Sequence, residues 1–337
     1  MHLEGTILHG RDFEPIEGRV VVENGRVEAV ERTETESTDV VCPAFVNAHT
    51  HIGDSVAKEA GAGLSLDDLV APPDGLKHRL LRAASREEMV AAMRRSLRFM
   101  QATGTAACVE FREGGVPGVE TFAAAREGID VDAVVLGRET EDAMHASDGF
   151  GASGARDGDF AAVRGATREA GKLFGIHAGE RDADDVDAAI DLAPDFLVHM
   201  VHATDDQIER VADSELPVAV CPRSNLVTNV GVPPIRRLAE RTTVALGTDN
   251  VMLNSPSMFR EMEFAAKLSD VSAETVLRMA TVDGADLAGL DCGVVEAGAP
   301  AKLLVLDGDS DNLGGAKDPV RAVVRRAGQA DVKRVVL

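Results

Sequence analysis

The chain has 337 residues, and its acids outnumber its bases by 57 to 35, which gives a formal net charge of −22 at pH 7. Such a surface repels polyanions, so the composition argues against binding to nucleic acid or to an anionic membrane. The bases are 28 Arg and only 7 Lys. This acid-rich, Lys-poor composition resembles that of halophilic proteins from a high-salt cytoplasm, where salt screens the repulsion between dense carboxylates.

The four cysteines, Cys42, Cys108, Cys221 and Cys292, are scattered and form no CxxC pair. They therefore predict neither a disulfide framework nor a cysteine-based zinc site. The first residues, MHLEGTILHG, lack the basic and apolar regions of a signal peptide. No apolar run approaches the length that spans a membrane. The sequence predicts a soluble, cytoplasmic protein.

Both ends of the chain are rich in strand-forming residues. Near the N-terminus, two apolar runs flank the turn Glu23-Asn24-Gly25, which is a strong hairpin signal. Near the C-terminus, residues 300–306, 320–325 and 331–337 are each predicted to be a strand. Together the ends predict a small β-sandwich domain built from residues 1–42 and 291–337.

The middle of the chain, residues 43–290, alternates between apolar strand-like runs and helical segments, the pattern of an α/β fold. Helix starts are indicated by Ser85 with Glu88 three residues later, and by Thr204 with Gln207. Eight strands in about 250 residues predict a (β/α)8 TIM-like barrel. The expected strands are 41–48, 105–111, 132–137, 148–152, 173–178, 195–200, 217–222 and 243–248. Residues 53–78 form the longest stretch without a clear pattern, and we expect it to be a loop that covers the rim of the barrel.

Residues that bind metals in other proteins follow several of these strands: His49, His51, His177, His199 and Asp249. In a parallel barrel the carboxyl ends of all strands meet at one rim, so these residues would surround one ion. His49 and His51 are two apart on a strand and therefore point to the same face. An HxH pair alone is a weak signal, and buried core histidines are the alternative interpretation. The full set predicts one divalent metal ion, with Zn2+ as the preferred metal and Fe2+ or Mn2+ as alternatives.

Glu180 lies three residues after His177, where it would crowd a metal ion but could carry protons above a substrate. The alternative is a glutamate that stabilises the start of a helix. His199 could either bind the metal or orient the attacking water. His202 has a weaker claim, because it also fits an exposed loop.

With these motifs the chain resembles the amidohydrolase superfamily. It is most similar to the aminohydrolase branch, which contains cytosine deaminase-like, adenosine deaminase-like and chlorohydrolase-like enzymes. The resemblance covers nearly the whole chain and rests on PAFVNAHTH, HAGE, LVHMVHATDDQ, AVCPRSN, VALGTDN and NSPSMFREMEFAAKL. It implies that His49, His51, His177 and Asp249 bind the metal.

The resemblance also implies that Glu180 is the proton shuttle, that His199 aligns the water, and that Asp249 accepts a proton. Members with two metals bridge them with a lysine on the fourth strand. The fourth-strand region here, ASDGFGASGARD, has no lysine, so one metal is expected. It also lacks the histidine with which many relatives contact substrate from that strand, and His145 comes too early to replace it.

The second and third strands end in CVEFREGG and VLGRE, which makes Glu110, Arg112 and Arg138 candidate substrate-binding residues. The alternative is that they pair with each other, for example Glu110 with Arg138. Asp54 and Lys58 could also line the site, whereas Arg223 and Asn225 are expected to hold a loop.

The predicted reaction is hydrolytic deamination of a small heterocyclic amine, such as a purine, pyrimidine or pterin-like ring, by metal-activated water. Hydrolysis of a cyclic amide, an imide or a halide-bearing ring is the alternative on the same fold. A non-catalytic binding protein is disfavoured, because it would need no proton shuttle. A homodimer is the expected assembly, since closed two-fold assemblies are the most common.

Overall fold

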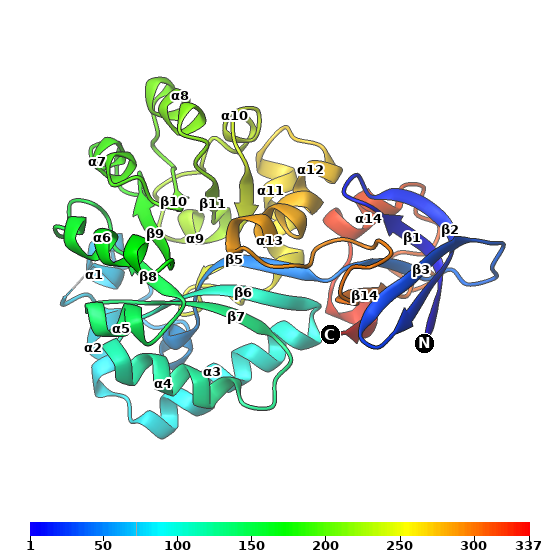
Figure 1. Cartoon of the computed structure of the whole chain (residues 1–337), viewed down its shortest axis with the longest axis horizontal. Coiled ribbons are helices and arrows are strands. Elements are labelled where there is room, and N and C mark those ends of the chain that lie inside the picture. The colour runs from blue at the N-terminus through cyan, green and yellow to red at the C-terminus, as the bar shows by residue number, and fades with distance from the viewer. Residues whose placement is uncertain (72) are drawn as a thin grey trace.

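The computed structural model describes residues 1–71 and 73–337 and contains two separate hydrogen-bonded sheets, one of nine strands and one of six (Figure 1). The nine-stranded sheet is parallel and curled, with the order β12-β11-β10-β9-β8-β7-β6-β5-β13. Its strands are β5 (Phe45–His51), β6 (Thr105–Arg112), β7 (Asp132–Gly137), β8 (Gly149–Ala152), β9 (Leu173–Ala178), β10 (Phe196–His199), β11 (Val218–Val220), β12 (Val244–Leu246) and β13 (Asp249–Asn250).

The curled sheet closes where β13, the continuation of β12, pairs with β5. Asp249 lies opposite Thr50 in this pairing. Just before it, Asn47 of β5 accepts a hydrogen bond from the backbone N–H of Thr248 at 2.9 Å and donates one to its hydroxyl at 2.7 Å. β12 and β13 therefore act as one eighth strand, and the predicted (β/α)8 TIM-like barrel is confirmed.

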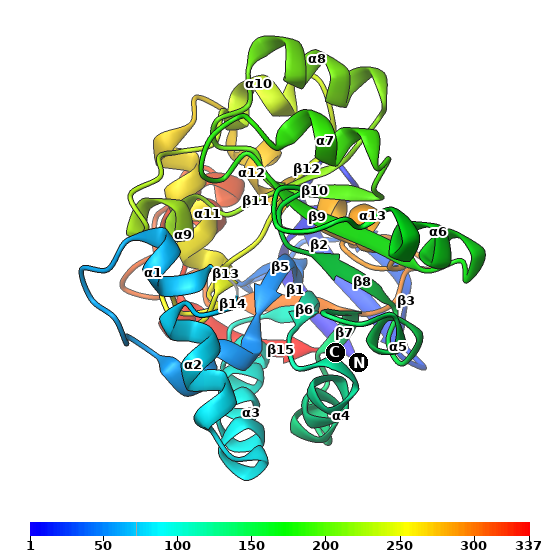
Figure 2. The same cartoon turned by 90° about the vertical axis from the view of Figure 1, so that its left-hand side faces the viewer.

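Helices surround the barrel strands, as Figure 2 shows from the end of the barrel near α1 and α2. The capping boxes predicted at Ser85 and Thr204 are present at the starts of α3 and α8. The helices are η1 (Ile52–Ala57), α1 (Leu66–Val70), α2 (Leu76–Ala83), α3 (Arg86–Ala102), α4 (Gly115–Arg126), α5 (Glu141–His145), α6 (Ala161–Glu169), α7 (Val186–Asp191), α8 (Asp205–Asp213), α9 (Pro222–Val227), α10 (Ile235–Ala239), α11 (Met258–Leu268), α12 (Ala273–Met279), α13 (Val282–Ala288), α14 (Pro319–Arg325) and η2 (Gln329–Asp331). Among the described residues, no helix is both long enough and apolar enough to cross a membrane.

The six-stranded sheet combines both ends of the chain and has the order β15-β14-β4-β1-β2-β3. Its strands are β1 (His2–His9), β2 (Glu14–Glu23), β3 (Arg26–Arg32), β4 (Val40–Pro43), β14 (Leu303–Leu306) and β15 (Val332–Val336). The predicted hairpin joins β2 to β3, and its loop residues Asn24 and Gly25 have φ values of 49° and 75°. Positive φ at both positions is what a two-residue type I′ turn requires. The sheet agrees with the small domain expected from the two termini.

Three local predictions are corrected by the structure. Residues 320–325 are not a strand but belong to helix α14, because Asp318 caps the first turn by accepting the N–H of Arg321 and Pro319 fits the first helical position. The expected loop 53–78 contains most of η1, all of α1 and the start of α2. The expected strand 41–48 is divided between β4 of the small sheet and β5 of the barrel.

Candidate metal and catalytic site

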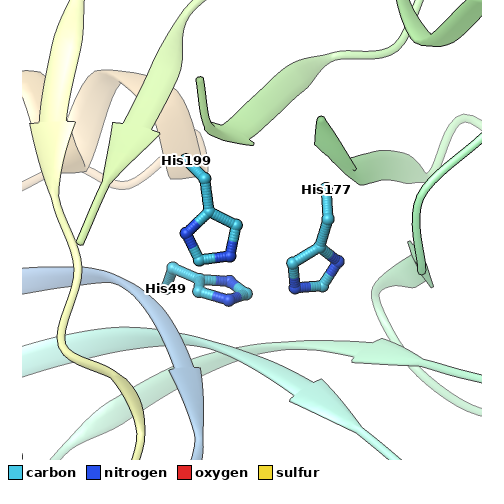
Figure 3. A group of neighbouring side chains, drawn as sticks. All are labelled: His49, His177 and His199. Atoms are coloured by element: carbon cyan, nitrogen blue, oxygen red, sulfur yellow. The ribbon is translucent and has the colours of Figure 1, made fainter. Parts of the chain in front are cut away.

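Three imidazole rings from different barrel strands converge inside the rim: His49 from β5, His177 from β9 and His199 from β10 (Figure 3). The ring centroids of His49 and His177 are 5.0 Å apart, and those of His177 and His199 are 5.3 Å apart. Their possible ligand atoms all lie within 4.8 Å of one another. The strand ends therefore meet as the parallel barrel dictates.

Asp249 and His51 complete this group, which we call the histidine cluster (His49, His51, His177, His199 and Asp249). Oδ1 of Asp249 is 3.3 Å from Nε2 of His49 and 3.7 Å from Nε2 of His51. Nε2 of His51 is also 3.4 Å from Nε2 of His177. The structure thus brings together all the residues that the sequence indicated as metal ligands.

The donor set of the histidine cluster fits a divalent cation. His49 is fully buried, and neither of its ring nitrogens has a hydrogen-bond partner among the described residues. His51 donates from Nδ1 to Glu113 at 2.8 Å, and His177 donates from Nδ1 to the carbonyl of Ala152 at 2.7 Å. Such contacts fix the ring and leave Nε2 unprotonated for a metal.

Charge in the histidine cluster also suits a cation. Burial lowers the pKa of His49, takes that of His51 to about 3 and holds that of His177 well below its usual value, which keeps these rings neutral. Burial alone would raise the pKa of Asp249, but its contacts with His49 and the nearby His199 outweigh this and keep it ionised. Neutral imidazoles beside one carboxylate are the protonation states that bind metal.

The backbone is strained where the cluster is built. His199 has φ = 79° and Asp249 has φ = 55°, a left-handed conformation that is uncommon for residues other than glycine. Such strain persists where the surrounding structure imposes it, and it concentrates at functional sites. His199 is the last residue of β10 and Asp249 is the first residue of β13, so the strain lies where both side chains enter the histidine cluster.

Glu180 lies beside the histidine cluster. Its Oε2 is 3.6 Å from Nε2 of His199, whose Nδ1 is 3.2 Å from the amide nitrogen of Asn225. Glu180, His199 and Asp249 form a further group whose ligand-type atoms lie within 4.8 Å of one another. Burial raises the pKa of Glu180, so this carboxyl group holds a proton more readily than an exposed glutamate.

A small cavity of about 110 Å3 opens onto this group. Four members of the histidine cluster line it together with Glu180, and Leu66, Asp67 and Val70 of α1 border it from the other side. Arg181, next to Glu180, forms an ion pair with Asp67 and so ties α1 to the segment after β9. The segment after β5 thus borders the cavity, as expected, but does so partly as helix.

A second set of buried charges lies next to His51. We call it the rim ion-pair network: Asp54, Lys77, Glu110, Arg112, Glu113 and Arg138. Lys77 of α2 is 3% exposed, and its Nζ is 2.7 Å from Glu113, 2.9 Å from Asp54 and 3.2 Å from Nδ1 of His51. Burial alone would lower the pKa of Lys77, but the two carboxylates outweigh burial and raise it.

The sequence prediction missed Lys77 and Glu113. Glu113 could have been found by continuing the alternation of β6 by one residue. Phe111 faces the histidines, and Glu113, two residues later, is expected to face the same side. Lys77 lies in the stretch without a periodic pattern, and no signal in the sequence marks it.

The three predicted substrate-binding residues have different surroundings. Arg138 lines the small cavity and pairs with Glu113 at 3.1 Å, not with Glu110. Glu110 and Arg112 do not line the small cavity and pair with each other at 3.2 Å, while Glu110 also accepts hydrogen bonds from Thr50 and from the N–H of Ile52. The structure does not bring these two to the histidine cluster.

The structure also gives the positions of the remaining candidate residues. Asp54 is buried against Lys77, and Lys58 does not line the small cavity. Arg223 pairs with Glu261 at 3.2 Å and holds the loop at Asn254. His145 and His202 are exposed.

Residues 40–337 match the family model described as the amidohydrolase family, so the chain belongs to that family. It is a hydrolase that acts on carbon–nitrogen bonds other than peptide bonds. It is 34% identical to an uncharacterized protein of Methanocaldococcus jannaschii, over 98% of this chain and 96% of that protein.

Two further similarities concern proteins named as deaminases. A 5-methylthioadenosine/S-adenosylhomocysteine deaminase of Halobacterium salinarum is 27% identical over 98% of this chain and 89% of that protein. A crystal structure of an adenosine deaminase from Xanthomonas campestris with bound zinc superposes with a TM-score of 0.80 at 20% identity, covering 99% of this chain and 90% of that one. At that identity, the second likeness concerns the fold alone.

Proposed function

We propose that the chain is a metal-dependent hydrolytic deaminase of a small heterocyclic amine, such as a purine, pyrimidine or pterin-like ring. The observation that carries this proposal is the meeting of Glu180, His199 and Asp249 with the histidine ligands at one small cavity. A proton-carrying carboxyl group, a second imidazole and a metal-type donor set are what the addition of water to an aromatic ring requires. The similarity to proteins named as deaminases supports the choice of leaving group.

We assign the metal to His49, His51, His177 and Asp249, and Zn2+ suits three imidazoles and one carboxylate best. Once bound, the ion would lower the pKa of a water ligand towards about 7 and so supply hydroxide at neutral pH. His199 lies beside both Asp249 and Glu180, where it would orient that water and hold it towards the ring.

Glu180 carries the proton in the proposed reaction. Because burial raises its pKa, the carboxyl group can protonate the ring nitrogen next to the carbon under attack. Asp249 accepts a hydrogen bond from Ser224 Oγ on its other oxygen, Oδ2, which holds the carboxylate in place. Asp249 takes up the proton released by the water and passes it to the ring amine, which leaves as ammonia. The new hydroxyl group becomes a ring carbonyl and returns its proton to Glu180.

The test is ammonia release from a panel of purines, nucleosides, pyrimidines and pterins, with zinc-loaded protein at high salt and the Glu180→Gln variant alongside. We expect release from at least one compound and a loss of about 10²–10⁴-fold in the variant, with its metal content unchanged. Full activity of the variant would reject the proton-shuttle role. If no compound releases ammonia although the protein holds one metal ion per chain, the result would count against deamination. It would favour hydrolysis of an amide, an imide or a halide.

A further inference from the structure

A second, larger cavity of about 700 Å3 lies next to the small one. His78, Arg138, Ser153 and Asp157 line both cavities and form the boundary between them. A ligand whose ring occupies the small cavity could therefore extend past these side chains into the larger one. The small cavity is the site already described, whereas the larger one has no role in the proposed chemistry.

The wall of the larger cavity is mainly apolar. Leu81 of α2, Met89 of α3 and Phe160 before α6 are partly exposed, so they present apolar surface to the space. Met93 and Phe150 are buried behind them, and the rings of Phe150 and Phe160 are 6.2 Å apart. An apolar group placed here would be removed from water against side chains that are already held in position.

The charges around the larger cavity do not form a site for a strongly anionic group. Its arginines are Arg82, Arg86, Arg112 and Arg138, and its acids are Glu113, Glu139 and Asp157. Arg112 and Arg138 both pair with Glu113, at 3.3 Å and 3.1 Å, and Arg82 pairs with Asp74 outside the lining. Arg86 is exposed and has no ion pair among the described residues, so a phosphate would meet one unpaired arginine, the paired ones and the carboxylates of Glu139 and Asp157.

We infer that the substrate is a ring amine with an uncharged, mainly apolar arm of several atoms, which lies in the larger cavity while the ring lies at the histidine cluster. This inference rests on the proposed function, because it deepens the description of the same site. Burial of the arm would contribute binding energy far from the reacting carbon and would select among ring amines that the small cavity alone cannot distinguish.

The test uses adenine and its 9-ethyl, 9-butyl and 9-hexyl derivatives, with 9-(4-carboxybutyl)adenine as the charged probe. Dissociation constants are measured on the zinc-loaded Glu180→Gln protein at high salt, where no turnover interferes. We expect the affinity to rise on the order of tenfold for every two methylenes until the cavity is filled, and to rise much less with the charged arm. The 9-hexyl to adenine affinity ratio should fall roughly tenfold when Met89→Gln or Phe160→Ala is added, because the arm loses apolar contacts.

Phe264→Ala is the matched control, since Phe264 is an exposed aromatic side chain on α11 that lines neither cavity. In this control the affinity ratio should keep its original value. Affinity independent of arm length, or ratios unchanged in both cavity variants, would overturn the inference. That result would leave the proposed function standing if the panel releases ammonia, whereas arm-dependent binding without ammonia release would count only against deamination.

Discussion

Two clusters of buried ionisable groups meet at His51, and they differ in whether a cationic side chain faces their acids. In the histidine cluster, three imidazoles face the carboxylate of Asp249, and no lysine or arginine among the described residues pairs with it. In the rim ion-pair network, Lys77 and Arg112 each contact the carboxyl groups of two acidic residues. Burial alone therefore does not mark a candidate metal site; the informative feature is a set of buried donor atoms that face one point without a cationic side chain among them.

The difference has an energetic reason. A buried charge is costly unless it is paired, so the rim network stabilises the fold only while it is complete. In the histidine cluster the imidazoles are neutral and Asp249 is the ionised group, so a bound cation would supply the partner that the rim acids already have. His51 belongs to both, since its Nδ1 donates to Glu113 and its Nε2 faces Asp249.

The largest effect is expected from His49→Ala. This substitution removes a proposed ligand from the histidine cluster, so we expect bound zinc to fall below one per chain. Activity should drop by at least about 10³-fold, since the metal would supply the nucleophile in the proposed reaction. Metal analysis after desalting, together with ammonia release, checks this. His202→Ala, an exposed histidine, serves as the control. Retention of one zinc per chain in His49→Ala would show that His49 is not a ligand.

A smaller effect on the site is expected from Lys77→Met, which leaves Asp54 and Glu113 without their shared cation. Glu113 would then hold His51 less well, and we expect zinc affinity to weaken by about 10–100-fold, the usual effect of losing a partner behind a ligand. The unfolding free energy should also fall, by about 3–5 kcal/mol, because the buried Asp54 loses its cation, while Glu113 keeps Arg112 and Arg138. Competition with a zinc chelator and chemical denaturation measure the two effects separately.

Lys267→Met is the matched control for Lys77→Met, since Lys267 pairs with Glu263 on the exposed face of α11. If Lys77→Met lowers stability but leaves zinc affinity unchanged, the rim network only supports the fold. The two clusters would then be independent in spite of the shared His51.

These two clusters also separate what the sequence could predict from what it could not. The histidine cluster was predictable because each member follows an apolar strand, and parallel strands must end at the same rim. The barrel itself follows from the same alternation of strands and helices. Glu110 and Arg112 were placed at the rim by their nearness to a strand end alone, without the alternation that turns them to the opposite face from Phe111.

Within the rim network, the position of Lys77 could not be predicted, for a different reason. Lys77 lies in a segment whose short helices, α1 and α2, show no apolar period long enough to predict, and its partners come from residues 54 and 113. Such a contact depends on tertiary packing alone. The strand predicted at residues 320–325 was wrong because valine-rich runs favour strands, while the cap at Asp318 and the contact with the barrel helices decide for a helix.

Within the rim network, Glu110→Gln is expected to change the pH dependence of stability and not the chemistry. Burial raises the pKa of Glu110 to about 8, whereas an unfolded glutamate titrates near about 4.3. The folded chain therefore holds this proton in the window between the two values. Its contribution to stability is fully present below about pH 4.3 and is lost progressively as the pH rises towards about 8.

Melting temperatures of Glu110→Gln and the parent protein at pH 5 and pH 8 check this expectation. The decrease from pH 5 to pH 8 should be smaller in the variant by several degrees, because the amide that replaces the carboxyl group has no proton to release. Equal decreases in both proteins would mean that Glu110 is ionised in the fold, as its partner Arg112 favours.

The smallest effect is expected from Asp67→Asn, which breaks the ion pair between α1 and Arg181 at the edge of the small cavity. Both side chains are about half exposed, so the pair should contribute only about 0.2–1 kcal/mol and change KM by no more than a few-fold. Salt screens an exposed pair but hardly affects a buried one. The KM difference should therefore vanish at high salt, whereas the effect of Lys77→Met on zinc affinity should persist there. If the Asp67→Asn effect also persists at high salt, α1 holds the substrate through more than charge, and this exposed contact belongs with the functional site and not with the surface.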